Sequence, residues 1–368
     1  MEARKNEAQW LEGTTRWRIS VQRDGLRRSF YSSTPGKRGK AEAERKAEKW
    51  LSTSTQRENV RFGPLWVEFL EKEKETTGTG NYRQHESMGR NWLLPRLEHK
   101  RVISITPQDW QNCIDDGFKA GLSKKTLSNL RGAVTAFFKY CRKCRIPMER
   151  PELLTIPRAA PAHKKNILQP SDLETLFTKD TVTIHGHEEP FFFIYACRFL
   201  VLTGLRPGEL CGLQNSDFKD TSFDIRRSVN QYGEITAGKN DNARRSVSLG
   251  VWANATLEGQ KALLRKNRII SKWVFPDENG EMLQSGHLYK KWVTYRKQHG
   301  ISCSLYEMRH TMISLARADV PEQLLKMLVG HSDSMDTFGV YGHEVDGDLQ
   351  RAGALLDKVF DRVIGGGL

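Results

Sequence analysis

The chain has 368 residues, enough for two or three domains, and 38% of them are hydrophobic, enough to build stable cores. Its 58 Lys and Arg residues outnumber its 44 Asp and Glu residues, so the formal net charge is +14. This excess favours nucleic acid over a membrane surface as the partner.

Several further features restrict the class of protein. The longest apolar run, Pro190–Leu205, contains Arg198 and is too short to span a bilayer. The opening segment Met1–Gln9 is charged throughout and lacks the pattern of a secretory signal. The six cysteines are scattered, so they do not form a disulfide framework. We therefore expect a basic cytoplasmic protein that does not associate with membranes.

Residues 1–53 have the pattern of a small sheet followed by a helix. The predicted strands are Gln9–Leu11, Trp17–Val21 and Leu26–Tyr31, with a hairpin turn signal at Asp24-Gly25 and a helix over Lys40–Leu51. Thirteen Lys and Arg residues stand against seven Asp and Glu residues here, and the predicted ribbon carries Arg16, Arg18, Arg23, Arg27 and Arg28. Such a ribbon can enter a DNA groove. The alternative is a basic ribbon with a solvated face.

Residues from Asn59 to about Arg158 are predicted to be helical. The expected helices are Phe62–Glu75, Tyr82–Leu94, Pro107–Gly117 and Ser123–Cys144. The last of these carries a row of basic residues that suits backbone phosphates, unless it is only a solvated face: Lys124, Lys125, Arg131, Lys139, Arg142 and Lys143. Its Cys141-x-x-Cys144 pair has no second pair nearby, so two reduced thiols are favoured over a zinc or redox site.

A proline-containing linker, Ile146–Asn166, precedes a second helical region that opens at Gln169-Pro170-Ser171-Asp172. An apolar helix over Phe191–Thr203 ends at Gly204, and the chain continues as Leu205-Arg206-Pro207-Gly208-Glu209-Leu210. This pattern is typical of a helix C-cap followed by a new helix at Pro207.

Three strands are predicted next, over Ser222–Val229, Gly233–Ala237 and Arg244–Leu249. The segment Gly238–Asp241 between the last two has the pattern of a hairpin turn that carries Lys239, with Arg245 six residues later. An exposed turn lysine is usually only solvated, so a catalytic role for Lys239 depends on the motifs around it.

The segment from Tyr306 to Tyr341 contains three short motifs: Y-E-M-R-H, L-V-G-H-S and V-Y-G-H. Arg309 supplies a planar cation that can grip a phosphate through two hydrogen bonds. His331 follows Gly330 at a helix end, and Tyr341, ten positions later, offers a phenol that can act as a covalent nucleophile. A further amphipathic helix is expected over Asp346–Ile364.

The order of these residues resembles the tyrosine recombinases, the family of phage and transposon integrases; it runs Arg206, Lys239, Arg309, His331, Tyr341. The resemblance is weak in the first third and strong from about Ile167. It implies a multidomain, mainly α fold with small β elements. The implied parts are an arm-type DNA-binding domain (1–53, a three-stranded sheet plus helix), a core-binding helical bundle (58–158) and a mixed α/β catalytic domain with a C-terminal tail helix (167–368).

The resemblance also implies a mechanism. Tyr341 attacks a DNA phosphodiester and forms a 3′-phosphotyrosine, Lys239 protonates the leaving 5′-oxygen, and Glu209 supports the site. The groups that stabilise the charge on the phosphate are Arg206, Arg309 and His331. The sequence offers neither a Walker loop nor a carboxylate cluster of the kind that two-metal sites use, so we expect transesterification without metal or nucleotide cofactor.

The sequence departs from the family pattern at Tyr306, where the family usually has a histidine three residues before the second arginine. A neutral phenol can donate a hydrogen bond to a phosphate oxygen, but it does not accept a proton near pH 7 as imidazole does. His310 matches the family's R-H pair and is interpreted as supporting. Tyr306 also competes with Tyr341 as nucleophile, and the spacing from His331 favours Tyr341. Asn240 and Ala243 depart from the usual Lys239 segment.

The expected function is site-specific integration and excision of a mobile element in a bacterium. The implied partners are arm and core sites of double-stranded DNA, further copies of the chain in a tetramer, and accessory bending or excision proteins. The tail helix either packs on its own domain or docks on the next protomer. The alternatives are a type IB-like topoisomerase and a DNA-binding regulator that has lost catalysis through the change at Tyr306.

Overall fold

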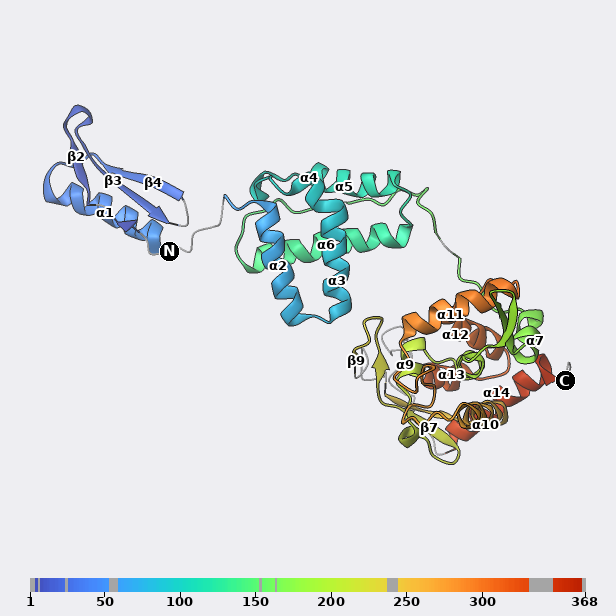
Figure 1. The fold of residues 1–368 in the computed structure, drawn as a ribbon. Coiled ribbons are helices and arrows are strands. Elements are labelled where there is room, and N and C mark those ends of the chain that lie inside the picture. The colour runs from blue at the N-terminus through green and yellow to red at the C-terminus, as the bar shows by residue number, and fades with distance from the viewer. Residues whose placement is uncertain are drawn as a thin grey trace. The chain divides into compact units, whose positions relative to one another are not determined.

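The computed structural model describes residues 4–5, 7–23, 26–52, 59–151, 154–162, 164–236, 244–330 and 347–365. The chain divides into two compact units, 1–163 and 164–368, and each is described by itself. Helices predominate and the sheets are small, which confirms the predicted fold class (Figure 1). Within the described ranges, no helix has the length and apolar character that crossing a membrane requires.

The first unit begins with an antiparallel sheet and one helix. The central strand β3 (Arg16–Arg23) pairs along one edge with β4 (Leu26–Ser32) and along the other with both β1 (Arg4–Lys5) and β2 (Gln9–Leu11), so the sheet is three strands wide. Helix α1 (Gly36–Ser52) packs on one face of it. The predicted strands and helix are confirmed within a few residues, whereas the turn signal Asp24-Gly25 lies outside the described residues.

The remainder of the first unit is a helical bundle. Its elements are α2 (Phe62–Thr76), α3 (Thr79–Met88), a π-helical turn (Gly89–Leu93), α4 (Leu94–Leu97), α5 (Pro107–Lys119) and α6 (Lys124–Lys143). Aromatic side chains fill the centre of the bundle: Phe62, Trp66, Phe69, Trp110 and Phe137. All four predicted helices are present, and the second one changes to a π-helical turn at Gly89.

Side-chain caps stabilise two helix starts in this bundle. Thr106 accepts a hydrogen bond from the backbone N–H of Asp109, whose carboxylate accepts one from the N–H of Thr106 in return, and Pro107 occupies the first helical position. Ser123 caps α6 through the N–H of Thr126. Such caps satisfy donors that a helix start otherwise leaves unpaired.

The second unit consists of eight helices among its described residues, with small β elements between them (Figure 1). The helices are α7 (Pro170–Thr178), α8 (Ile194–Thr203), α9 (Pro207–Cys211), α10 (Val251–Lys266), α11 (Ser285–Gln298), α12 (Leu305–Ala316), α13 (Glu322–Val329) and α14 (Asp348–Val363). Nearly every residue of α8 is buried, and α10 and α12 pack against it. Helix α8 is therefore the centre of this unit's core.

The strands of the second unit form three antiparallel pairs: β5 (Thr181–Ile184) with β6 (His187–Pro190), β7 (Ser222–Ile225) with β10 (Arg245–Ser248), and β8 (Ser228–Val229) with β9 (Ile235–Thr236). The sequence did not predict the first pair. It also predicted a hairpin of the two strands that flank Lys239. That pairing is wrong for the described residues, because β10 pairs with the earlier β7 and β9 pairs with β8.

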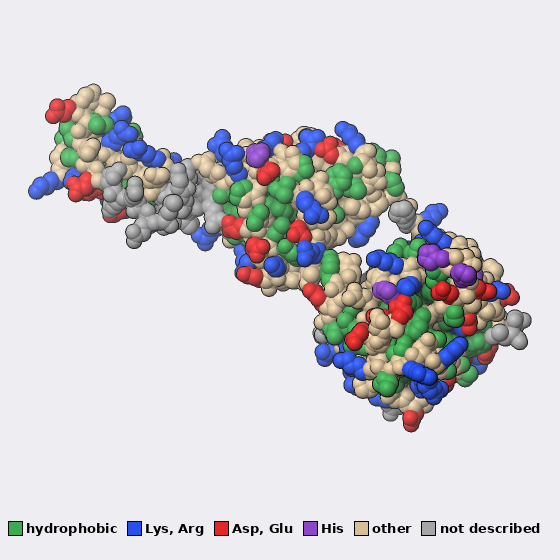
Figure 2. All heavy atoms as spheres, in the orientation of Figure 1, with side chains coloured by type: hydrophobic (Ala, Val, Ile, Leu, Met, Phe, Trp, Pro, Cys, Tyr) green, Lys and Arg blue, Asp and Glu red, His purple; other side chains and the backbone are tan. Residues whose placement is uncertain are grey.

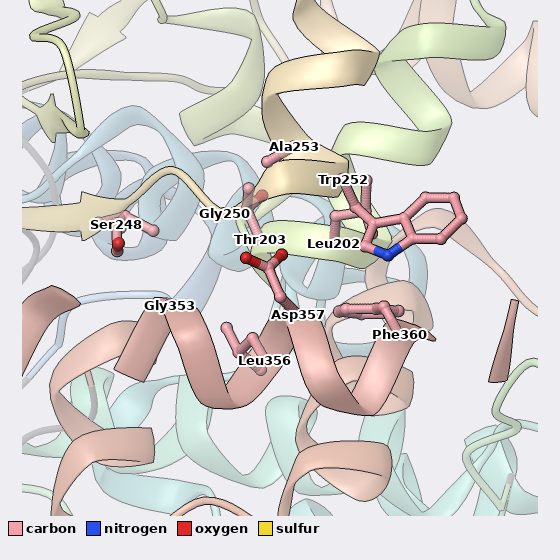
Figure 3. Close-up of a pocket in the computed structure, with 11 residues that line it drawn as sticks. Leu202, Thr203, Ser248, Gly250, Trp252, Ala253, Gly353, Leu356, Asp357 and Phe360 are labelled. Atoms are coloured by element: carbon pink, nitrogen blue, oxygen red, sulfur yellow. The ribbon is translucent and has the colours of Figure 1, made fainter. Parts of the chain in front are cut away.

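The C-terminal helix α14 packs on its own unit, one of the two arrangements expected for the tail (Figure 3). Asp357 accepts a hydrogen bond from the backbone N–H of Val251 at 2.9 Å and so caps the start of α10. Trp252 donates from Nε1 to Asp361 at 2.8 Å. Arg362 forms a two-bond ion pair with Asp319, beyond the end of α12. These bonds join α14 to two other parts of the same unit.

All six cysteines lie among the described residues and are outside disulfides. Cys141 is buried in the bundle and Cys144 is exposed beyond the end of α6, and neither is in a disulfide. In the described part of the chain, no group of three or more His, Cys, Asp or Glu residues has the arrangement of a metal site.

Candidate active site

The site begins where α8 ends and α9 starts. Gly204 closes α8 with φ of 64°, a conformation that glycine adopts without strain, and Pro207 starts α9. Arg206 stands between them as the N-cap residue. Its backbone N–H donates to Oε2 of Glu209 at 2.9 Å, and its Nη1 donates to Oε1 at 2.7 Å. The side chain of Arg206 is 35% exposed, so part of its guanidinium remains accessible.

Arg309 approaches the same place from α12. This helix begins with a capping box between Ser304 and Glu307, which sets Arg309 in its second turn. Only 2% of Arg309 is exposed. It donates from Nη1 to the carbonyl oxygen of Gly204 at 2.9 Å and from Nη2 to that of Val329. Both acceptors are neutral, and no carboxylate in the described part of the chain forms an ion pair with Arg309.

A third arginine, Arg245 of β10, completes the cluster. Its Nη1 and Nη2 donate to the two carboxylate oxygens of Glu209 at 3.2 and 3.1 Å, and its Nε donates to the carbonyl oxygen of Leu328 at 2.8 Å. The side chains of Arg245 and Glu209 are 7% and 4% exposed. Two guanidinium groups thus bind a single carboxylate, and the charge of Arg309 lies near enough to interact with it, so the cluster carries an excess of positive charge.

The pKa shifts follow from this crowding. Burial, together with the charges of Arg206 and Arg245, lowers the pKa of Arg309 to about 10. Burial alone would raise the pKa of Glu209, but Arg245 and then Arg206 outweigh it and hold the pKa below its ordinary value. Burial also disfavours the charged form of Arg206, yet Glu209 outweighs this effect and raises its pKa. The cluster therefore stays charged at neutral pH and attracts an anion such as a phosphate.

Tyr306 lies at the rim of the cluster, in the first turn of α12, and is 50% exposed. Its phenol is close enough to Arg206 to contribute, after Glu209, to the raised pKa of that guanidinium. The Tyr306 ring meets the His310 ring edge to face at 5.7 Å. Burial and then the positive charges of Lys165 and Arg309 lower the pKa of His310, and its Nε2 has no hydrogen-bond partner among the described residues. His310 is therefore neutral at pH 7 and supports the ring of Tyr306.

The structure brings four of the predicted site residues together, namely Arg206, Glu209, Tyr306 and Arg309. His310 contacts the ring of Tyr306. Lys239, His331 and Tyr341 lie outside the described residues. The chain is described up to Thr236 and again from Arg244, and up to Gly330 and again from Gly347.

The predicted arginines of the N-terminal sheet divide between its two faces. Val21 of β3 is in the core with α1, and side chains alternate along a strand, so Arg16 and Arg18 lie on the opposite face of the sheet. Arg27 lies on that face as well, because it pairs with Gln22 in the register. The Arg16 guanidinium stacks over the Tyr31 ring at 4.4 Å. Arg28 pairs with Val21, whose side chain is in the core with α1, so Arg28 lies on the helix face.

The predicted lysines of α6 are all exposed. Lys124 and Lys125 lie in its first turn and Lys139 near its end. Lys139 lines a surface hollow together with Arg142 and Lys143. Figure 2 shows Lys and Arg side chains spread over the visible face of each unit, with Asp and Glu among them. The structure thus leaves these cations available to solvent or to an anionic partner.

Sequence reasoning did not assign a role to Arg245. The only signal was its distance of six residues from Lys239, which says nothing about its partner. The partner, Glu209, lies 36 residues earlier in the chain. A buried bidentate pair between positions so far apart has no local pattern in the sequence.

Comparison with known proteins agrees with this geometry. Residues 171–347 match the sequence profile of the phage integrase family. The chain is 26% identical over 316 residues to tyrosine recombinase XerC of Bacillus licheniformis, covering 80% of this chain and 95% of that protein. It is 25% identical over 385 residues to a tyrosine recombinase XerC-like protein of Caldanaerobacter subterraneus subsp. tengcongensis, covering 91% and 92%.

Solved structures share the fold. An integrase of the Tn1549 transposon in complex with transposon right end DNA has a TM-score of 0.62 at 19% identity, covering 80% of this chain and 98% of that chain. A lambda integrase tetramer bound to a Holliday junction has a TM-score of 0.58 at 16% identity, covering 92% and 98%. At these identities the likeness concerns the fold alone.

The match to the family profile and the likeness to tyrosine recombinases along most of the chain identify an enzyme that breaks and joins DNA strands. The segment that matches the family profile contains all three arginines. Residues 171–347 form a phage integrase family domain, and the chain is a tyrosine recombinase.

Proposed function

We propose that the chain is the integrase of a mobile element, which cleaves DNA strands and rejoins them to new partners through a 3′-phosphotyrosine. The observation that carries this proposal is the arginine cluster. Arg206, Arg245 and Arg309 bring three positive charges against the single negative charge of Glu209. A site prepared in this way stabilises the extra charge that develops on a phosphodiester during nucleophilic attack.

The reaction needs one nucleophile and one proton donor in addition to the arginines. The Tyr341 oxygen attacks the phosphorus, the bond from phosphorus to the 5′-oxygen breaks, and Lys239 gives the leaving oxygen a proton. Arg206, whose guanidinium is partly exposed, binds a non-bridging oxygen. His331 supplies a further hydrogen bond. The 3′-phosphotyrosine conserves the energy of the broken bond, so a second 5′-hydroxyl can reverse the step on another strand.

Tyr306 and Arg309 differ in what they can reach. The exposed phenol of Tyr306 can donate a hydrogen bond to a phosphate oxygen directly. Arg309 has five N–H donors, and two of them donate to the carbonyls of Gly204 and Val329. Three N–H donors therefore remain for the phosphate. The buried arginine therefore both fixes the backbone of the site and contributes charge to it.

The first unit serves DNA binding in two parts. Residues 1–53 bind arm sites through the sheet face that carries Arg16, Arg18 and Arg27. Residues 58–158 bind the core site through the basic residues of α6, including Lys124, Lys125 and Lys139. Their exposure, and the sheet reading of DNA known for other β-ribbon proteins, support these assignments.

Four copies of the chain assemble on two core sites, as the likeness to a lambda integrase tetramer bound to a Holliday junction suggests. Accessory bending or excision proteins act with this assembly. In the described residues α14 packs on its own unit, so the protomer can fold without a neighbour covering that surface.

The test uses a nicked suicide duplex made from the core sequence at the end of the element. The full-length chain should form a covalent adduct at the 3′ end and release a 5′-hydroxyl strand. With two intact core sites it should also produce Holliday junctions, which a simple topoisomerase does not make. A chain that binds the duplex and forms no adduct would be a regulator instead.

A further inference from the structure

Arg245 makes contacts with two parts of the catalytic unit that are distant in sequence. Its two terminal nitrogens hold both oxygens of Glu209, and its Nε holds the carbonyl oxygen of Leu328. Glu209 in turn holds the backbone and the guanidinium of Arg206. One planar group thus connects the start of α9 to the end of α13.

The backbone carbonyls at the end of α13 take part in this arrangement. The last four carbonyls of a helix have no partner within it. In α13, the N–H of Gly330 donates to the carbonyls of Lys326 and Met327, at 2.9 and 3.3 Å. The remaining two carbonyls, Leu328 and Val329, accept from Arg245 and Arg309. Two guanidinium groups therefore fix the point from which the chain continues to His331.

The chemistry of this position calls for an arginine. A guanidinium presents donors in a fixed fork, so it can grip a carboxylate with two nitrogens while a third donates elsewhere. A lysine offers one ammonium nitrogen, which cannot reach both Glu209 oxygens and the Leu328 carbonyl in this geometry. Because the Arg245 side chain is only 7% exposed, water cannot fully replace the lost bonds.

We propose that Arg245 is a positioning residue of the strand-transfer reaction, which holds Arg206 in register with the end of α13 through Glu209. This role of Arg245 rests on the proposed function, since it concerns the same phosphate site. Arg245 contributes indirectly to stabilising the negative charge on the scissile phosphate, because the residues that it orients bind the non-bridging oxygens. Its loss should therefore affect charge stabilisation in particular, beyond any loss of stability.

The second unit offers a matched control in Arg198 of α8. Its side chain is 8% exposed, close to the value for Arg245. It also joins one carboxylate, that of Asp180, with one helix-end carbonyl, that of Leu176, at 2.8 Å for the latter. Among the described residues, the hydrogen bonds of Arg198 go to Leu176 and Asp180 and not to the arginine cluster. Arg198→Met thus removes a bridge made by an equally buried arginine, although to a more exposed carboxylate, without disturbing the phosphate site directly.

The experiment measures single-turnover cleavage by the full-length chain on two suicide duplexes. One has an ordinary scissile phosphodiester, and the other has a methylphosphonate, in which a methyl group replaces one non-bridging oxygen and removes the negative charge. The quantity compared is the ratio of the two rates for each protein. Wild type, Arg245→Lys, Arg245→Met and Arg198→Met are measured, with the melting temperature of each.

We expect Arg245→Lys and Arg245→Met to slow cleavage of the phosphodiester by about 100-fold, the loss that a misplaced catalytic group causes. Cleavage of the methylphosphonate should slow much less. The ratio of the phosphodiester rate to the methylphosphonate rate should therefore fall about tenfold or more below that of wild type. Arg198→Met should keep the wild-type ratio, even where its melting temperature falls.

Equal slowing of both duplexes by the Arg245 variants, or undiminished cleavage by Arg245→Lys, would overturn the assignment and leave Arg245 a structural residue. If Arg245→Met does not fold, Arg245→Lys decides the question alone. A wild-type chain that forms no adduct on the phosphodiester would instead contradict the proposed function, so the two failures are distinguishable.

Discussion

Arg309 donates a hydrogen bond to the carbonyl oxygen of Gly204 at 2.9 Å, across 105 residues of sequence. This bond joins α12, which carries Arg309 and Tyr306, to the turn that leads into Arg206. The two arginines of the family pattern are therefore not independent, because the backbone beside one is the hydrogen-bond acceptor of the other. The substitutions below test that connection and the roles around it.

Gly204→Ala should destabilise the fold and slow cleavage. The positive φ costs an alanine about 1–2 kcal/mol, and the new Cβ would lie 2.1 Å from Cε of Met312, a buried residue of α12. Moving Met312 in a packed core costs roughly 1–3 kcal/mol more. Urea unfolding measures the sum. The control is Gly300→Ala, where φ is +70° and a Cβ meets no atom within 4 Å. Equal losses for the two variants would exclude a role for the contact.

Glu209→Gln should lower the free energy of unfolding by about 3 kcal/mol at pH 7, because the buried Arg245 and the half-buried Arg206 lose their charged partner. The pKa of Glu209 is below its ordinary value of 4.5 in the folded chain, so the unfolded chain takes up the proton first on acidification. The stabilisation by Glu209 is therefore complete above pH 4.5 and is lost as the pH falls through the folded-state pKa.

Urea titrations of both proteins between pH 3 and 7 check this dependence. The difference between wild type and Glu209→Gln should shrink on the acid side of 4.5. Glu258→Gln, which changes an exposed partner of Lys261, should match wild type throughout. A constant difference for Glu209→Gln across the range would show that its charge does not hold the cluster.

Tyr306→Phe should slow single-turnover cleavage roughly 10–1000-fold, the range expected for removal of one transition-state hydrogen bond. Tyr306→His should keep substantial activity, because imidazole can also donate. The exposed position of the phenol beside Arg206 favours this donor role over a packing role. Near-wild-type cleavage by Tyr306→Phe would show that the hydroxyl takes no part in the chemistry.

The two faces of the N-terminal sheet allow a matched test of arm-site binding. Arg18→Gln and Arg27→Gln, on the face opposite α1, should each weaken arm-DNA binding and reduce the slope of log K against log salt by about 1. Arg28→Gln removes the same charge from the helix face and should have a smaller effect. Deleting 1–53 should abolish integration and spare cleavage of a short core duplex. Equal effects at all three arginines would argue against a specific binding face.

Local patterns in the sequence predicted most of the secondary structure. Alternation found the strands on either side of Asp24-Gly25, and Thr106-Pro107 fixed the start of α5, because caps and pleats leave signals within a few residues. The β5–β6 hairpin was missed since every residue of β6 is exposed, which removes the alternation of buried and exposed positions. Pairing of β10 with β7 was missed because register between distant strands has no local signal.

The candidate site shows the same division. Motif spacing identified Arg206 and Arg309, and the structure places both in one cluster. The bonds that connect them run through Glu209, Arg245 and the carbonyls of Gly204 and Val329. Apart from the local bond between Arg206 and Glu209, these bonds span 20 to 105 residues of sequence, so no local pattern predicts them.

The proposed reaction depends on Tyr341 as the covalent nucleophile. The direct measurement is adduct formation on a nicked core duplex by wild type, Tyr341→Phe and Tyr306→Phe, separated on denaturing gels, with DNA binding measured in parallel. Tyr341→Phe should bind the duplex normally and form no adduct, whereas Tyr306→Phe should form it slowly. An adduct that persists in Tyr341→Phe and disappears in Tyr306→Phe would show that the nucleophile is Tyr306 of α12 instead.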